Sequence, residues 1–161
     1  MGAQKPRYMV YRRASLKLET SVKTIEFLYP ANLGWDCTRC GACCRDAGER
    51  ERCILLLETD ISRLEGQHGS EEFAEPIRGR EPFVAEMRKI GGRCFFLSDD
   101  GCSAYDRRAL LCRMYPFWVE RSGDLFIIRA DGACPGTSGE PLGEAFFSGL
   151  LGRAVVERGG I

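Results

Sequence analysis

The sequence predicts a small α+β domain organised by metal–thiolate bonds, with short hairpins and a C-terminal helix. Three observations lead to this class: eight patterned cysteines, several short alternating segments between turn residues, and one long amphipathic segment near the end. Alternation with period two is typical of strands, and a period of 3.6 is typical of helices. With 161 residues, 44% of them hydrophobic, the chain can form one domain with its own apolar core.

The first part of the chain, residues 1–34, is expected to form an N-terminal arm and a β-like extension. Residues 1–13 are polar and basic and show no period. In residues 14–29, apolar side chains alternate with polar ones, as in Ile25, Phe27 and Tyr29. This alternation predicts two short strands that pair as a hairpin.

The next segment begins with the densest group of cysteines. Residues 37–45 are expected to form a turn or a short helix, and residues 45–52 form a charged, solvated loop. The aliphatic run at 53–57 predicts a short buried strand or a lead-in to a helix. Thr59 or Asp60 is then expected to cap that helix, because both side chains can accept a backbone N–H.

Turn residues divide the middle of the chain into short elements. Ser70–Phe73 is expected to form one helical turn. The glycine pair Gly91-Gly92 predicts a hairpin between strands at 83–90 and 93–97. Residues 98–101 form a further turn.

The last third is expected to contain two helices and a hairpin. Asp106 is placed to cap a helix at 107–114, and the following proline ends it. Residues 117–129 predict a second hairpin. The amphipathic segment 140–157 predicts a docked terminal helix whose apolar face includes Leu142, Ala145, Phe146, Leu150, Leu151, Ala154 and Val155.

Eight cysteines follow a pattern that is typical of soft-metal binding. They are Cys37, Cys40, Cys43, Cys44, Cys94, Cys102, Cys112 and Cys134. A Cys-x-x-Cys turn brings two sulfurs to one point, so we predict all eight as ligands of a metal ion or cluster. The ninth, Cys53, has no partner spacing and is predicted to be a small buried hydrophobe.

The adjacent pair Cys43–Cys44 bears on which metal is bound. Neighbouring side chains are expected to diverge, which makes joint binding of one ion awkward and favours an iron–sulfur cluster. The Cys37-x-x-Cys40-x-x-Cys43 run also matches the first three thiols of a bacterial ferredoxin, and Cys134-Pro135 is similar to its closing Cys-Pro. A 4Fe–4S cluster is therefore favoured, with two four-thiolate zinc sites as the alternative.

Composition argues against nucleic-acid and membrane partners. The chain has 23 basic and 23 acidic residues, so it lacks the basic excess that those partners usually require. Its longest aliphatic run, Ile54–Leu57, is too short to span a bilayer, and its start lacks a signal-peptide pattern. We therefore expect a cytoplasmic protein with reduced thiols, whose partners are the metal and a redox or protein partner.

Two other side chains are candidates for the site. His68 is the single histidine and lies in a polar loop, so it is expected at the surface rather than at a metal. Arg113 follows Cys112 directly. It is expected to donate to a cluster sulfur, to pair with an acid or to face solvent.

The cysteines and their neighbours together resemble the YkgJ-type CxxCxxCC family of zinc- or iron-chelating domains. The residues that carry the resemblance are Trp35-Asp-Cys37-x-x-Cys40-Gly-x-Cys43-Cys44, Cys94-Phe-Phe-Leu97, Gly101-Cys102-x-x-Tyr105, Arg108-x-x-x-Cys112-Arg-x-Tyr-Pro-Phe117 and Cys134-Pro-Gly136. The resemblance implies one metal-binding domain at 35–136 that uses these cysteines. The amphipathic pattern predicts that residues 137–161 form a helix packed on the same domain. Ala109 departs from the family, which tends to have proline there.

These observations lead to three expected functions. The first is an iron–sulfur protein in electron transfer or metal handling. The second is a zinc-stabilised structural or interaction module. The third is a methylase-like enzyme that acts at the cluster, because a flagellin lysine methylase is distantly similar in its cysteine group. The residues themselves identify no catalytic side chain.

Overall fold

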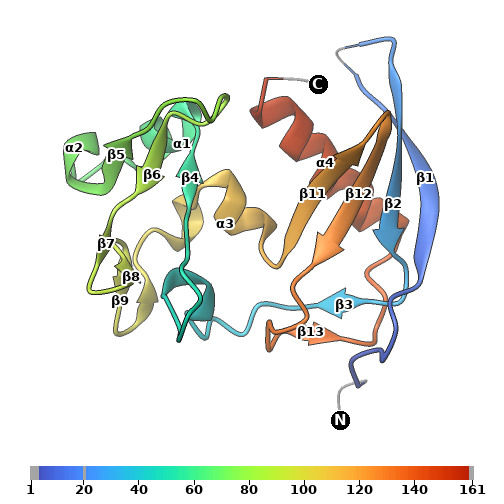
Figure 1. The fold of residues 1–161 in the computed structure, drawn as a ribbon, viewed down its shortest axis with the longest axis horizontal. Coiled ribbons are helices and arrows are strands. Elements are labelled where there is room, and N and C mark those ends of the chain that lie inside the picture. Colours follow the sequence, from blue (N-terminus) through green and yellow to red (C-terminus); the bar gives the residue numbers. More distant parts are fainter. Residues whose placement is uncertain (1–3, 20, 160–161) are drawn as a thin grey trace. The chain divides into compact units, whose positions relative to one another are not determined.

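The computed structural model describes residues 4–19 and 21–159, and its chain divides into two compact units (Figure 1). Unit 1 consists of residues 1–38 and 115–156, and unit 2 consists of residues 39–114 and 157–161. Among the described residues, unit 1 combines strands with one long helix near the C-terminus, and unit 2 combines strands with several short helices. The predicted α+β class is confirmed.

Unit 1 is built on a four-stranded sheet with the order β1-β2-β12-β11. The strands are β1 (Tyr11–Lys17), β2 (Thr24–Pro30), β11 (Phe117–Ser122) and β12 (Leu125–Ala130). Both predicted hairpins are present, with Ala14 opposite Phe27 and Val119 opposite Ile128. The two hairpins join through a parallel pairing of β2 with β12, in which Phe126 lies opposite Phe27.

The core of unit 1 lies between this sheet and α4 (Glu144–Glu157), of which Glu157 is assigned to unit 2 (Figure 1). Phe147 is fully buried, and its ring centroid lies 5.5 Å from that of Tyr29 and 5.2 Å from that of Phe117. The predicted terminal helix is thus confirmed, but it begins at Glu144. Its buried face uses Phe147 rather than Ala145, which is exposed. Phe147 lies three and four residues before Leu150 and Leu151 and therefore shares their face of the helix, whereas Ala145 does not.

A short ribbon completes unit 1. It pairs β3 (Gly34–Trp35) with β13 (Thr137–Ser138), and Thr137 lies opposite Trp35. The ribbon therefore joins the stretch that precedes the first cysteines to the stretch that follows the last one.

Unit 2 contains a three-stranded sheet and two small hairpins. The sheet has the order β4-β6-β5, formed by β4 (Leu55–Leu56), β5 (Ala74–Pro76) and β6 (Ala85–Met87). The hairpins are β7 (Lys89–Ile90) with β8 (Arg93–Cys94), across the predicted Gly91-Gly92 turn, and β9 (Leu97–Ser98) with β10 (Gly101–Cys102). Both glycines have positive φ, which side-chain-bearing residues rarely adopt.

The helices of unit 2 are short: α1 (Glu58–Leu64), α2 (Ser70–Phe73), α3 (Leu110–Met114) and the 3₁₀ turns η1 (Ala42–Cys44) and η2 (Tyr105–Arg107). The predicted helical turn at Ser70–Phe73 is confirmed. The predicted continuous helix at 107–114 is wrong, because Arg108 has an extended backbone with ψ of 148°. This residue separates η2 from α3, and Asp106 caps nothing in α3.

Asp60 caps two helices at once. Its side chain is fully buried, and its carboxylate accepts the N–H of Leu57, the N-cap of α1, at 2.9 Å. The other carboxylate oxygen accepts the N–H of Leu110, the first residue of α3, also at 2.9 Å. Asp60 therefore acts from the third position of α1 rather than as its N-cap residue, and it supplies the cap that was expected from Asp106.

Replacing Asp60 by alanine is expected to lower the free energy of unfolding by about 2 kcal/mol, because two buried N–H groups lose their acceptor. Urea unfolding measures this change. Ser62→Ala, on the exposed side of the same helix, is the matched control and should stay within about 0.5 kcal/mol of the parent. Equal stability of the two variants would contradict the double-capping role.

Burial raises the pKa of Asp60 above its ordinary value of 3.8, and its two backbone hydrogen bonds only partly oppose this. A raised pKa means that the favourable contribution is complete below the unfolded-state pKa and is lost as pH rises through the folded-state pKa. The stability advantage of the parent over Asp60→Asn should therefore shrink as pH rises from 4 toward neutrality. Unfolding curves of both proteins across this range test the sign, and an advantage that grows with pH would contradict it.

Candidate metal centre

All nine cysteines are free thiols. Six of the eight predicted ligands belong to unit 2, and the other two belong to unit 1.

The adjacent thiols Cys43 and Cys44 lie on η1 in unit 2. Their sulfurs are 3.9 Å apart, so the expectation that these side chains diverge is wrong. The tight 3₁₀ turn, which starts after Gly41 with its left-handed backbone, brings the two sulfurs to the same side. Two thiolates on one tetrahedral zinc ion lie about 3.8 Å apart when the Zn–S bond is about 2.3 Å. The pair therefore has nearly the separation that a single metal ion requires.

Three later cysteines gather with Cys44 in the apolar core of unit 2. Cys94 is buried in a cluster with Phe73 and Phe96, and Cys44, Cys102 and Cys112 pack against the same cluster. The two hairpins that follow β6 position Cys94 and Cys102, and the Asp60 cap positions the helix that carries Cys112. Residues far apart in sequence thus bring four thiols to one apolar cluster.

Burial and mutual repulsion raise the pKa of most of these thiols. Burial is the main cause for Cys94, Cys102 and Cys112, and the charges of neighbouring thiols act in the same direction. In the adjacent pair, the Cys44 thiol donates to Cys43, which lowers the pKa of Cys43 to about 6 and raises that of Cys44. The two adjacent thiols therefore shift each other's pKa in opposite directions.

The other charges that act most strongly on these thiols are arginines. Arg52 and Arg108 lower the pKa of Cys43, and Arg107 and Arg108 lower that of Cys102. A metal bound by four thiolates carries excess negative charge, which these guanidinium groups would offset.

The thiols lie near one another without forming a closed set of ligands. Within residues 4–19 and 21–159, no three His, Cys, Asp or Glu side chains stand close enough to hold a metal ion as placed. The donor chemistry nevertheless fits zinc or iron, because thiolates are soft ligands and a bound cation deprotonates them outright.

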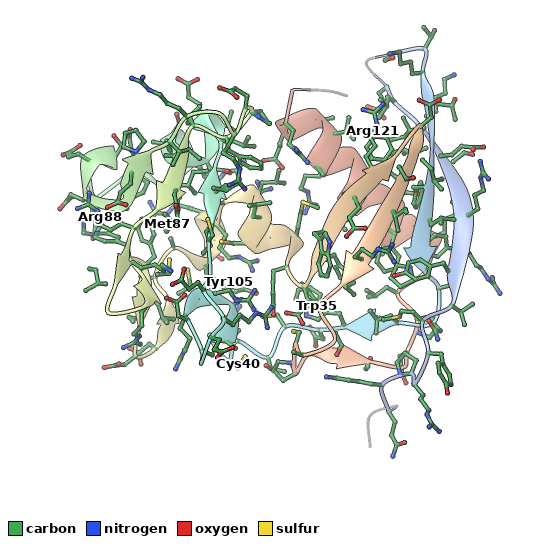
Figure 2. The ribbon with its side chains drawn as sticks, in the orientation of Figure 1. Trp35, Cys40, Met87, Arg88, Tyr105 and Arg121 are labelled. Carbon is green, nitrogen blue, oxygen red and sulfur yellow. The ribbon has the colours of Figure 1, made fainter. Side chains whose placement is uncertain are left out.

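Cys40 differs from the other thiols of unit 2 predicted as ligands because it is exposed, at the outer side of the loop before η1 (Figure 2). Arg39 beside it has φ of 56°, a left-handed backbone that costs a residue with a side chain about 1–2 kcal/mol. Its guanidinium stacks on Tyr105, with 4.1 Å between the Arg39 Cζ and the ring centroid. A cation–π contact of about 1 kcal/mol offsets much of that cost.

Unit 1 brings Cys37 near the loop that contains Cys134. Asp36 donates its N–H to the Gly136 carbonyl at 3.0 Å, and continuation of the β3–β13 register places Cys37 opposite Pro135. A Cβ on Gly136 would lie 2.3 Å from the Asp36 carbonyl oxygen. The close approach of these two cysteine-bearing stretches therefore requires glycine at 136.

Cys53 is exposed, so the prediction that it is a buried hydrophobe is wrong. It stands two residues before β4, outside the apolar run that the strand buries. The charges that act most strongly on it belong to Glu86, Arg80 and Lys89 rather than to other thiols. This position agrees with its exclusion from the predicted ligands.

Of the three environments expected for Arg113, the structure shows the pairing with an acid. It forms an ion pair with Glu157 and donates its Nε to the Arg108 carbonyl at 3.0 Å. Arg63 joins the same carboxylate at 3.1 Å. Burial raises the pKa of Glu157, but the two arginines outweigh that effect and hold it below its usual range. This network fixes the backbone on both sides of α3.

His68 is half-buried against Phe95, with 5.0 Å between the ring centroids, and its Nδ1 lies 3.2 Å from a carboxylate oxygen of Glu72. It is therefore a packing residue beside the apolar cluster that contains Cys94.

Among the helices that the structure describes, none is long and apolar enough to cross a membrane.

Comparison with known proteins identifies the family. The CxxCxxCC family model, described as "Putative zinc- or iron-chelating domain", matches residues 36–135, which is more than half of the chain. The chain belongs to the CxxCxxCC family. The sequence-based identification is thus confirmed, and the thiols described above lie within the match.

One relative is the uncharacterised protein MJ0661 of Methanocaldococcus jannaschii, which is 29% identical. The alignment covers 64% of this chain and 57% of the relative, so the chain spans little more than half of that protein's length. No solved structure gives a significant match. The comparisons therefore support metal chelation and leave the identity of the metal to chemical argument.

Gly136→Ala is expected to lower the free energy of unfolding by about 2 kcal/mol, because the new methyl group would overlap the Asp36 carbonyl. Gly132→Ala is the matched control, since a Cβ there meets nothing within 4 Å and the residue lacks a left-handed backbone. Chemical denaturation of both variants tests this difference. If both variants were as stable as the parent, the close packing of the Cys134 loop on Asp36 would be disproved.

Proposed function

We propose that the protein chelates a single zinc or iron ion through a four-thiolate centre in unit 2, and that it takes part in metal handling. The 3.9 Å separation of the Cys43 and Cys44 sulfurs carries this proposal, because it suits two ligands of one tetrahedral ion. Terminal thiolates on different irons of a cluster stand farther apart, since irons and inorganic sulfides lie between them.

The remaining ligands come from the other thiols of unit 2. Cys94, Cys102 and Cys112 are supported by their shared apolar surroundings with Cys44. Cys40 is supported by its place three residues before Cys43, which gives the Cys-x-x-Cys spacing. Two of these four thiols would complete the set with Cys43 and Cys44. Metal bound here would then link η1 to a later part of unit 2, so binding energy would also be folding energy.

An iron–sulfur cluster, 4Fe–4S in the sequence-based prediction, is the second candidate. The observation in its favour is the number of thiols. Unit 2 holds six of the eight cysteines of the pattern, which is more than one tetrahedral ion can bind. Under this candidate the protein would transfer electrons to a redox partner. In either case the reduced thiols fit a cytoplasmic location.

Elemental analysis with visible spectroscopy distinguishes the two candidates in protein purified without air. One zinc per chain and no colour supports the mononuclear zinc centre. One iron per chain without acid-labile sulfide supports the mononuclear iron centre. Brown protein with sulfide equal to iron would replace both with the cluster. Protein without stoichiometric metal would contradict chelation itself.

Cys112→Ala is expected to lower metal content and thermal stability together, because α3 would lose its link to η1. Cys53→Ala is the matched control, since that thiol is exposed and lies outside the thiol group. Metal per chain and melting temperature are measured on both variants. Full metal content in Cys112→Ala would remove this residue from the ligands, and metal loss in Cys53→Ala would add that residue to them.

A further inference from the structure

The ring of Tyr105, on η2 of unit 2, is contacted by two guanidinium groups. The Cζ of Arg108 lies 3.8 Å from the ring centroid, and the Cζ of Arg39 lies 4.1 Å from it. Like charges repel, so two cations on one ring require a geometry that the surrounding chain enforces. We call these three residues the Tyr105 stack.

The Arg108 side of the Tyr105 stack is fixed. Arg108 donates its Nε to the Tyr105 carbonyl at 2.8 Å. Its own carbonyl accepts from Arg113 at 3.0 Å and from Arg63 at 3.3 Å. Arg108 therefore holds the ring at a set position on the segment between Cys102 and Cys112.

The Arg39 side belongs to the loop that carries Cys40. Arg39 and Gly41 flank this exposed thiol, and both have left-handed backbones, with φ of 56° and 76°. The Nε of Arg45 donates to the Gly41 carbonyl at 3.4 Å, and a Cβ on Gly41 would lie 3.4 Å from Leu97. The loop is thus held on both sides of Cys40, by Tyr105 before it and by Arg45 after it.

We propose that the Tyr105 stack is a positioning device that sets Cys40 as the thiol through which metal enters and leaves the centre. This inference rests on the proposed chelating function. Cys40 is the exposed member of the CxxCxxCC run, whereas Cys37, Cys43 and Cys44 are partly buried. An incoming ligand can therefore approach the metal most easily from the side of Cys40.

The exchange is a ligand substitution without redox change. An acceptor with thiolate or nitrogen donors forms a bond to the metal while the bond between the metal and the Cys40 sulfur breaks. The released thiolate takes a proton from water. The Tyr105 stack restrains the loop in the bound position, because the strained Arg39 backbone depends on the ring contact for compensation.

The test uses protein loaded with zinc and a chromophoric chelator in excess, and it records zinc per chain and the rate of zinc transfer. Tyr105→Leu removes the ring face, whereas Tyr105→Phe keeps it and serves as the matched control. We expect transfer about tenfold faster from Tyr105→Leu, the size typical for loss of a residue that orients a ligand. Tyr105→Phe should transfer zinc at the parental rate, with one zinc per chain in all three proteins.

A second pair keeps the proposal testable if Tyr105→Leu fails to fold. Arg39→Leu should accelerate transfer, whereas Arg39→Lys, which keeps a cation over the ring, should do so much less. In a Cys40→Ser background, Tyr105→Leu should give no further acceleration, since the effect acts through Cys40. If Tyr105→Leu acted only by lowering the stability of the protein, it would accelerate zinc transfer in the Cys40→Ser background as well.

The outcomes separate the two proposals. Parental protein that retains no zinc or iron would overturn the proposed function. Parental protein that retains metal, combined with equal transfer rates for Tyr105→Leu and Tyr105→Phe or for Arg39→Leu and Arg39→Lys, would overturn the role of the Tyr105 stack alone. Acceleration that persists in the Cys40→Ser background would likewise overturn it.

Discussion

The arrangement of the clustered cysteines of unit 2 depends on one buried carboxylate. Asp60 accepts backbone N–H groups at the start of both α1 and α3. Because α3 spans only Leu110–Met114, its own hydrogen bonds cannot stabilise it. Asp60 and the arginine pair on Glu157 supply what the short helix lacks. The position of the Cys112 sulfur is thus determined by residues of α1 and by the last residue of α4.

Local sequence signals predicted most elements, because hairpins and amphipathic helices depend on nearby residues. The Gly91-Gly92 turn and the alternation around Phe27 are examples. The division of the predicted helix at Arg108 escaped prediction, since the cap that starts α3 comes from fifty residues earlier in the chain. The local sequence predicted Asp106 as the cap of this helix, but the carboxylate of Asp60, which is distant in sequence, accepts the N–H at its start.

The candidate site was predictable in composition but not in arrangement. Cysteine spacing predicted eight ligands and left out Cys53. It gave the wrong orientation for Cys43 and Cys44, because a 3₁₀ turn and the side-chain rotamers decide the distance between adjacent sulfurs. The Tyr105 stack escaped notice although Tyr105 and Arg108 belong to the motif shared with the family. The sequence did contain a signal for this stack, because an arginine stands close to each of two cysteines, Arg39 before Cys40 and Arg108 before Cys112.

The division of the chain into units has a consequence for the order of folding. Unit 1 is discontinuous, and the parallel pairing of β2 with β12 joins residues on either side of 39–114. During synthesis, β2 must therefore wait for its partner until residues 39–114 have emerged, whereas the β7–β8 and β9–β10 hairpins of those residues can already form. If the intervening stretch becomes compact first, the loop that β2 and β12 must close is effectively shorter. A metal taken up early would then bind the nascent chain before the four-stranded sheet of unit 1 forms.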